Sequence, residues 1–258
     1  MKIGKRNISL FFIFDRRHYL ALFNIFFYCK NPIDFFLRYF LSKCSYPVAI
    51  DIKTPEGLIS PTIYFYDDSL TVNEIFFRLD YKAEKNLKTF IDIGANIGIS
   101  ALYFLTRNNF SKGYLYEPVP TNLDKLEKNL VKFKDRIEVK PLDVYTDDID
   151  KKFGVEKTGR LGGINRKTDE FIDVNCININ QVLEEVLQKE KFIDILKIDI
   201  EGDELTVIKA IDKKYFNKIG LIYFDIDYTL KIDKNIKILG NNFEESVYGN
   251  TYVLKNKN

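Results

Sequence analysis

The sequence predicts an α/β fold in which a doubly wound, mostly parallel sheet follows an N-terminal helical extension. Two observations carry this prediction. From Lys88 onward, short apolar segments alternate with stretches of helical periodicity, as they do in a parallel sheet with crossover helices. The first of these segments runs directly into a glycine turn and a helix start, the connection beside which doubly wound sheets bind ligands. We therefore expect the extension at residues 1–47 and the main domain at residues 48–258.

The extension is aromatic and basic. Residues 1–50 contain eight Lys and Arg residues against two Asp residues, whereas the whole chain has a formal net charge of only +2. Asn31 and Pro32 favour the start of a second helix in this segment. Its aromatic side chains can pack on the main domain or lie on a membrane surface beside Lys and Arg, and both interpretations stay open.

Composition argues against several classes of protein. No run reaches the ~18 apolar residues that a membrane span needs. The three cysteines, Cys29, Cys44 and Cys176, lie far apart without CxxC spacing, which argues against a zinc site or a disulfide framework. They favour a reducing, cytoplasmic location, at the inner face of the membrane if the extension binds one.

The predicted elements follow in order along the chain. Two strands, at residues 48–53 and 58–66, are joined by a Pro55-Glu56-Gly57 turn. A helix after residue 120 has apolar residues at steps of three and four and a capping box of Thr121 and Asp124. Strands of the parallel sheet are expected at residues 89–93, 114–116, 137–142, 193–198 and 221–226. A loop is expected at 154–169, a strand at 171–177, a helix at 181–191 and a closing antiparallel strand or hairpin at 246–254.

The stretch FIDIGANIG at residues 90–98 joins a buried strand to a glycine turn and a helix start. Gly94 and Gly98 permit positive φ and let a ligand approach the backbone closely. Asp92 is placed to accept hydrogen bonds from a ligand ammonium group or from the amides of the turn. The spacing D-x-G-x-x-x-G differs from the G-x-G-x-x-G that binds a pyrophosphate. A plain strand-to-helix connection is the alternative.

Acidic residues follow the next two strands. Glu117 ends the second strand about 20 residues past the glycines, where a nucleoside ribose is held through its hydroxyls. Taken alone, Glu117 can also be a solvated strand end, but together with the glycine turn it favours a nucleoside site. Asp143 follows the third strand and can receive an adenine amino group, with a surface acidic loop as the alternative.

The fourth predicted strand carries ionisable side chains in the stretch DILKIDIEGDE. Lys197, Asp199 and Glu201 are two residues apart and therefore share one face. Ionisable groups are costly on a parallel strand unless they pair or line a cavity. Lys197 thus needs a partner, with Asp199 or Glu201 as the nearest candidate. Asp203 and Glu204 have a simpler explanation, as acids in the first turn of a helix.

These three elements together resemble the FkbM family of methyltransferases. The matching stretches are FIDIGANIGISALYF (90–104), YLYEPVPTNLDKLEKNL (114–130) and DILKIDIEGDELTVIKA (194–210). The resemblance covers about residues 50–258 and implies a Rossmann-like class I methyltransferase fold, S-adenosylmethionine as methyl donor, and O-methylation of a hydroxyl, often on a sugar or polyketide-type acceptor. It implies donor contacts from Asp92, Gly94, Asn96, Gly98 and Glu117. It also places Lys197, Asp199 and Glu201 next to the transferring methyl group.

Methyl transfer is an in-line displacement at a sulfonium carbon, so positioning of the nucleophile comes first. A hydroxyl also benefits from a general base. The single histidine, His18, lies in the extension, so we expect Asp199 or Glu201 to accept the proton, oriented by the neighbouring lysine. No metal is expected; a divalent metal held by these two carboxylates and by Asp225 or Asp227 is the alternative.

Other function classes stay open. A nicotinamide-dependent oxidoreductase shares the acid after the glycines, although the glycine spacing argues against it. A non-catalytic module that binds glycans or a membrane surface would keep the fold without turnover. A nucleic-acid acceptor is not expected, because the main domain lacks a dense basic stripe with exposed aromatic residues. The expected acceptor is a small molecule or a glycan, with the basic loop at 154–169 as a candidate lid.

Overall fold

The computed structural model describes residues 2–3, 6–7, 16–41, 44–155, 162–163, 168, 170–200, 202–225, 237–248 and 251–257. The chain divides into two compact units, Met1–Glu84 with Thr106–Asn109 and Lys85–Leu105 with Phe110–Asn258. Two predicted site positions, Glu201 and Asp227, lie outside the described residues, as does most of the basic loop. None of the helices in the described ranges is long and apolar enough to cross a membrane.

The first unit contains the helical extension. Its helices are α1 (Arg16–Tyr28), α2 (Pro32–Leu41), α3 (Tyr66–Val72) and the π-helical turn η2 (Asn73–Phe77). As predicted, the second helix begins at Pro32, because the fixed φ of proline suits the first helical position. Residues 48–84 belong to the same compact unit as these helices. Where the functional domain begins, placed at residue 48 from the sequence, stays a prediction.

The strands of the first unit are short. They are β1 (Lys2–Ile3), β2 (Arg6–Asn7), β3 (Val48–Ala49), β4 (Ile52–Thr54), β5 (Gly57–Ile59) and β6 (Thr62–Ile63). Each of the two strands predicted after residue 47 is divided in two, so that β4 pairs with β5 and β3 pairs with β6. The predicted turn is confirmed, and Gly57 adopts a positive φ of +102° at its end.

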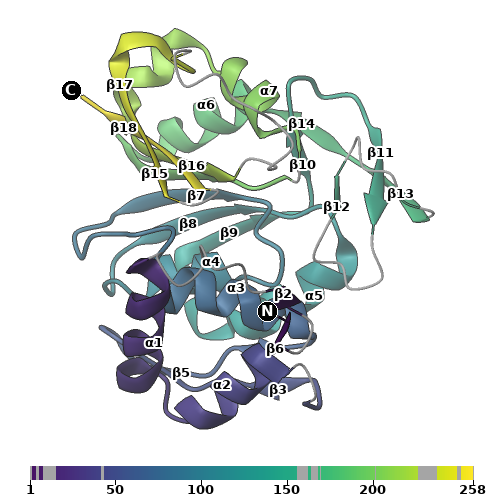
Figure 1. The fold of residues 1–258 in the computed structure, drawn as a ribbon. Coiled ribbons are helices and arrows are strands. Elements are labelled where there is room, and N and C mark those ends of the chain that lie inside the picture. The colour runs from purple at the N-terminus through teal and green to yellow at the C-terminus, as the bar shows by residue number, and fades with distance from the viewer. Residues whose placement is uncertain are drawn as a thin grey trace. The chain divides into compact units, whose positions relative to one another are not determined.

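The second unit is built on one seven-stranded sheet in the order β17-β18-β16-β15-β7-β8-β9 (Figure 1). Its strands are β7 (Thr89–Ile93), β8 (Lys112–Tyr116), β9 (Ile137–Lys140), β15 (Ile193–Ile198), β16 (Ile219–Asp225), β17 (Phe243–Tyr248) and β18 (Thr251–Asn256). The five strands from β16 to β9 are parallel, and β18 is antiparallel to both of its neighbours. The predicted doubly wound, mostly parallel sheet and its closing hairpin are confirmed.

Helices cover both faces of this sheet (Figure 1). Those of the second unit are α4 (Ile99–Leu105), α5 (Pro120–Asn129), α6 (Ile179–Lys189) and α7 (Glu204–Lys209), with short 3-10 turns η3 (Val131–Arg136), η4 (Lys213–Lys218) and η5 (Gly240–Asn242). Side chains of α6, such as Val182 and Val186, share one buried core with Ile91 and Leu196 of the sheet. α4 packs on the opposite face, where the rings of Phe104 and Phe90 lie 5.0 Å apart.

Two predictions about local structure were wrong. Thr121 does not cap α5: the helix begins at Pro120, after Val119 in the N-cap position, and no side chain caps it. The single strand predicted at 171–177 is divided between two sheets. β13 (Glu170–Val174) pairs with β11 (Lys151–Val155), which also pairs with β12 (Gly162–Gly163), whereas β14 (Cys176–Asn178) pairs with β10 (Asp143–Tyr145). The loop predicted at 154–169 therefore contains the end of β11 and the two residues of β12.

Candidate active site

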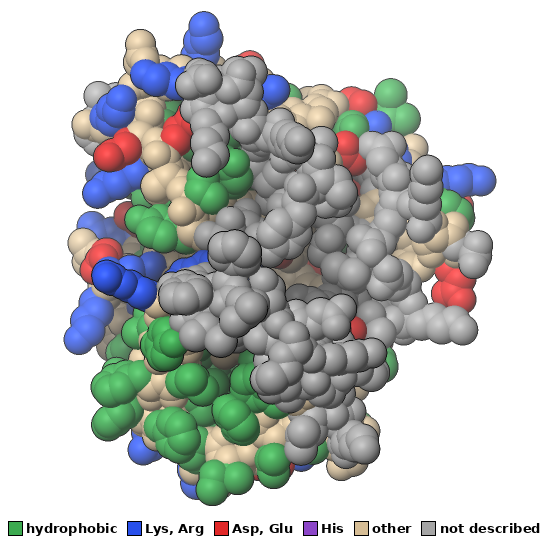
Figure 2. Space-filling model, viewed as in Figure 1, with side chains coloured by type: hydrophobic (Ala, Val, Ile, Leu, Met, Phe, Trp, Pro, Cys, Tyr) green, Lys and Arg blue, Asp and Glu red, His purple; other side chains and the backbone are tan. Residues whose placement is uncertain are grey.

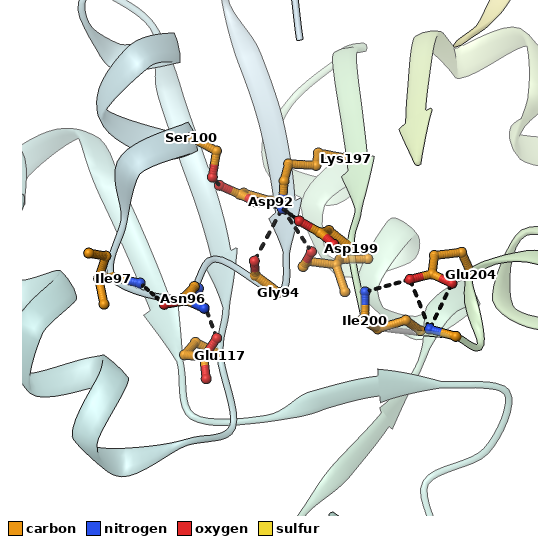
Figure 3. A network of polar contacts seen from close by, with 12 residues as sticks. Asp92, Gly94, Asn96, Ile97, Ser100, Glu117, Lys197, Asp199, Ile200 and Glu204 are labelled. Atoms are coloured by element: carbon orange, nitrogen blue, oxygen red, sulfur yellow. Dashed lines mark hydrogen bonds and ion pairs between the residues drawn. The ribbon is translucent and has the colours of Figure 1, made fainter. Parts of the chain in front are cut away.

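The candidate site lies where β15, β7 and β8 end side by side (Figure 3). The register places Asp92 of β7 opposite Lys197 of β15 on one side and Leu115 of β8 on the other. Because the three strands are parallel, the residues that follow them gather at the same edge of the sheet. Most of the residues predicted from three distant stretches of sequence are thereby brought to one place.

The glycine turn after β7 has the predicted backbone. Gly94 and Gly98 have φ of +73° and +84°, and Asn96 also lies in the left-handed region at +49°. A Cβ at Gly94 would lie 1.9 Å from the backbone oxygen of Asp199, so the residue must be glycine for the end of β15 to approach the turn. The Asn96 side chain accepts a hydrogen bond from the N–H of Ile97 at 2.7 Å, which supports its unusual conformation.

Lys197 is the centre of a buried ion-pair network. Its Nζ lies 2.9 Å from Oδ1 of Asp92 and 3.4 Å from Oδ2 of Asp199, and it donates a hydrogen bond of 3.1 Å to the carbonyl of Gly94. The Ser100 hydroxyl donates to the other oxygen of Asp92. Figure 3 shows these side chains pointing toward one another from β7, β15 and α4. Lys197 therefore ties the fourth strand to the glycine turn.

The opposite charges in this network stabilise one another. Burial by itself lowers the pKa of Lys197, but the negative charges of Asp92 and Asp199 outweigh it, so the pKa of Lys197 lies above its usual value. Burial raises the pKa of Asp92, and the charge of Lys197 opposes that shift. Lys197 is consequently a fixed cation rather than a proton acceptor. Its expected partner Asp199 is in contact, but Asp92 on the neighbouring strand is closer.

Glu117 is buried, with 4% of its surface exposed, which excludes the alternative of a solvated strand end. Its Oε2 accepts the N–H of Asn96 at 2.8 Å, and its Oε1 accepts the N–H of Val119 at 3.0 Å and the side-chain amide of Asn122 at 3.2 Å. Burial raises the pKa of Glu117 to about 7, against the effect of these hydrogen bonds. The carboxyl group thus couples the end of β8 to the glycine turn.

Asp143 is also buried, with 3% of its surface exposed, and does not belong to a surface loop. It begins β10, and its Oδ1 accepts the N–H of Val144 at 2.9 Å. Burial raises its pKa to about 7, and the charge of Glu117 adds to the shift. The charge of Glu117 thus reaches Asp143, which places the two carboxyl groups in one part of the second unit.

One residue of the candidate site was not predicted from the sequence. Glu204 does occupy the first turn of α7, as predicted, but its side chain turns back toward the preceding loop. It accepts the N–H of Ile200 at 3.1 Å and that of Gly202 at 3.0 Å, on both sides of position 201 (Figure 3). Burial raises the pKa of Glu204 to about 7. The signal in the sequence was Gly202, whose φ of +125° leaves its N–H pointing at the acid that follows.

The structure tests the metal alternative only in part. Within the ranges that the structure describes, no group of three His, Cys, Asp or Glu side chains could hold a metal. The metal alternative also involves Glu201 and Asp227, which lie outside those ranges, and stays untested. Around the turn, the buried carboxyl groups of Asp92, Glu117 and Asp143 outnumber the buried cation Lys197. Once Glu117 and Asp143 are ionised, such a site favours a positively charged ligand.

A family model described as "Methyltransferase FkbM domain" matches residues 92–240 of this chain. The chain belongs to the FkbM methyltransferase family. Every residue placed in the site from the sequence, from Asp92 to Glu201, lies inside the range that matches this FkbM domain. Together with the seven-stranded sheet, the match identifies the fold as the Rossmann-like fold of class I methyltransferases.

Individual relatives of this FkbM chain are distant. Methyltransferase sdnD of Sordaria araneosa is 25% identical over 166 residues, which is 50% of this chain and 62% of that protein. The chain thus matches less than two thirds of that relative's length. A methyltransferase FkbM structure from Methylobacillus flagellatus KT is 17% identical with a TM-score of 0.42, covering 74% of this chain and 54% of that one.

A further structure similar to this FkbM chain is TrmK of M. capricolum in complex with S-adenosyl-homocysteine. It is 16% identical with a TM-score of 0.40, covering 73% of this chain and 68% of that one. Structural similarities with TM-scores this low carry no argument. The family match alone assigns the chain to its family.

Proposed function

We propose that this FkbM-family chain is an S-adenosylmethionine-dependent methyltransferase that methylates a hydroxyl group of a small molecule or glycan. The observation that carries the proposal is the position of Glu117. Its buried carboxyl group accepts the N–H of Asn96 inside the glycine turn, and its charge acts on the buried Asp143 in the same unit. A glycine turn flanked by two such acids fits the ribose and the adenine of a nucleoside donor.

The residues divide the recognition of the donor among them. Glu117 accepts a hydrogen bond from a ribose hydroxyl, since an ionised carboxylate offers about four lone-pair sites and the protein occupies three of them. Asp143 accepts the adenine amino group. When bound, S-adenosylmethionine supplies an electrophilic methyl group on a sulfonium cation. The surplus of buried carboxyl groups favours that cation and disfavours the diphosphate of a nicotinamide dinucleotide.

Asp199 is the described carboxylate best placed to act as base. It follows the end of β15, and its side chain is 34% exposed, so an acceptor hydroxyl can reach it. With the donor bound, Asp199 would take the proton of the acceptor hydroxyl as the methyl group moves from the sulfonium sulfur to the hydroxyl oxygen, which leaves a neutral thioether. Lys197, 3.4 Å away and protonated, orients the carboxylate without competing for that proton. Glu201, predicted from the sequence as a second candidate, belongs to the same proposal.

We place this activity in the cytoplasm. Cys29, Cys44 and Cys176 are all free thiols, and two of them are buried. Thiols in this state are typical of a reducing compartment.

Calorimetric titration with S-adenosylmethionine, S-adenosylhomocysteine and NAD tests the donor. Saturable binding of the two sulfur nucleosides without binding of NAD is expected. Glu117→Ala should weaken binding at least about tenfold, because a hydroxyl contact to a charged group is lost. Glu127→Ala, on the exposed surface of α5, is the matched control and should bind normally. Folded protein that binds NAD, or binds none of the three, would overturn the proposal.

A panel of glycans and small hydroxyl compounds, assayed with isotope-labelled S-adenosylmethionine, then tests the acceptor. We expect the labelled methyl group to be transferred to an oxygen of one acceptor. If the protein binds the donor by itself but transfers no label to any compound of the panel, a non-catalytic binding module is favoured instead.

A further inference from the structure

The helix α1 has its apolar side turned to solvent. Only Ala21, Asn24 and Ile25 are buried, and they lie on one face of the helix. On the opposite face, Phe23 is 57% exposed, and Phe26 and Phe27 are exposed by 63% and 58%. The rings of Phe23 and Phe27 lie 4.3 Å apart and cover each other rather than the protein interior. Of the two interpretations of the extension, packing on the main domain or contact with a membrane surface, this exposure favours the second for this face of α1.

The next helix continues the pattern. In α2, Phe35 and Tyr39 are buried, and Phe35 packs edge-on against Phe77 at 5.0 Å. Ile33 is nevertheless 71% exposed, and Leu37, four residues later on the same side of the helix, is 42% exposed. Figure 2 shows hydrophobic side chains gathered over α1 and α2. We call this surface the α1–α2 face; it consists of Leu20, Phe23, Phe26, Phe27, Ile33 and Leu37.

The charges near this face are positive. α1 contains no Asp or Glu, and Arg16 at its start is exposed. Lys30, between the two helices, has 57% of its side chain exposed and forms an ion pair with Asp51 at 3.2 Å. The acid of α2, Asp34, is paired with Arg38. Exposed phenylalanines bordered by arginine and lysine are the composition of helices that lie in the interface of an anionic bilayer.

We propose that the α1–α2 face docks on the surface of an anionic lipid bilayer, with the phenylalanines at the level of the acyl chains and Arg16 and Lys30 at the phosphate groups. A large exposed apolar patch marks an interaction surface rather than ordinary protein surface. A second copy of this chain is a poorer occupant, because an isologous dimer would bring two basic segments together. The bilayer surface offers both the apolar layer and the opposite charge.

Flotation of the full-length protein with vesicles tests the proposal. The probes are vesicles of phosphatidylcholine alone and of phosphatidylcholine with phosphatidylserine. The wild-type protein should float with the anionic vesicles. Phe23→Ser with Phe27→Ser should reduce the bound fraction at least about tenfold, because two apolar anchors are removed. Arg16→Gln should reduce binding to the anionic vesicles about fivefold and leave the zwitterionic value unchanged.

The matched control carries the same chemical change elsewhere. Phe110 and Phe171 are each 52% exposed and lie outside α1 and α2. Phe110→Ser with Phe171→Ser should bind vesicles as the wild type does, and thermal unfolding should confirm that both double variants are folded. Equal flotation of the two double variants would overturn the proposal. So would a wild-type dimer in light scattering that dissociates in Phe23→Ser with Phe27→Ser while no vesicle binding occurs.

Discussion

The backbone oxygen of Asp199 occupies the space that a side chain at Gly94 would need. A Cβ at residue 94 would lie 1.9 Å from that oxygen, and the φ of Gly94 is +73°. The N–H of Asp199 donates to the carbonyl of Ile93 at 3.1 Å, so the two chain segments are held at this distance. The glycine turn and the proposed base are therefore parts of one rigid arrangement, and a change in either displaces the other.

Gly94→Ala should accordingly reduce both donor binding and turnover. The methyl group must push the end of β15 away, and alanine at positive φ adds about 1 kcal/mol of strain. Gly57→Ala is the matched control: its φ is +102°, but a Cβ there meets nothing within 4 Å. Calorimetry should find normal donor affinity for Gly57→Ala and at least about tenfold weaker binding for Gly94→Ala. Equal affinities would contradict the close packing of turn and strand.

Lys197→Met should destabilise the fold by about 3–5 kcal/mol, because it leaves Asp92 buried without its cation. Without Lys197, burial raises the pKa of Asp92 above its unfolded value, so the variant should lose stability as pH rises from about 4 toward neutrality. Urea unfolding across this range measures both effects. Lys189→Met removes the exposed ion pair with Glu138 and should cost about 1 kcal/mol or less. A similar cost for the two variants would refute the structural role of Lys197.

Donor affinity should rise with pH near neutrality. Burial raises the pKa of Glu117 and of Asp143 to about 7, above the usual values of 4.5 and 3.8. Groups whose pKa is higher in the folded state stabilise it at low pH, and this stability is lost as pH rises through about 7. The ionised groups, however, are those that receive the donor, so its binding releases protons. Calorimetry in buffers of different ionisation enthalpy measures the protons released.

The double variant Glu117→Gln with Asp143→Asn supplies the control for this pH dependence. It cannot ionise at either position, so both the proton release and the rise in affinity should disappear. A slope of affinity against pH that survives in the double variant would assign the effect to other groups, among which Glu204 is the first to test, since its pKa is also raised to about 7.

Asp199→Asn should lower kcat at least about 100-fold and change the donor Kd less than about twofold, because an amide cannot take the acceptor proton. Asp212→Asn, an exposed acid before η4, should leave both values unchanged. The measurement is steady-state kinetics with the acceptor found by the panel. Full turnover by Asp199→Asn would transfer the role of base to Glu201.

Glu204→Ala should lower kcat without a comparable change in donor affinity. Its removal leaves the N–H groups of Ile200 and Gly202 without their acceptor and frees the loop that carries position 201. Loss of stability by about 1–3 kcal/mol is expected as well. Glu204→Gln keeps an oxygen that can accept both N–H groups and should restore most of kcat. If Glu204→Gln is as slow as Glu204→Ala, the carboxyl charge matters and a purely positioning role is wrong.

The parts of the fold that were predicted correctly are those that local sequence determines. β7 and β15 were predicted with their observed limits, because each is a short, mostly apolar segment that ends at a glycine or an acidic residue. The positive φ of Gly94 and Gly98 followed from spacing alone. By contrast, the strand at 171–177 is divided because residues on either side of Asn175 pair with different partners, and pairing is a tertiary property.

The site, too, was predicted only in part. Lys197 was recognised as a charge that needs a partner, but the closest partner lies on another strand, Asp92, and only the register of β15 on β7 brings them opposite. The role of Glu204 was missed because acids in a first helical turn usually need no further explanation. Its contacts with Ile200 and Gly202 depend on the direction in which the chain leaves β15.

The strand β18 lies between β16 and β17 although it follows both in the chain. On the ribosome, β17 therefore emerges before the strand it must pair with, and one edge of β16 stays bare until residues 251–256 have been made. Unpaired strand edges recruit other chains, which makes this nascent state prone to aggregation. A chain whose synthesis pauses before residue 251 should bind chaperones that cover strand edges. Once β18 has been made and has paired with β16, the chain should no longer bind them.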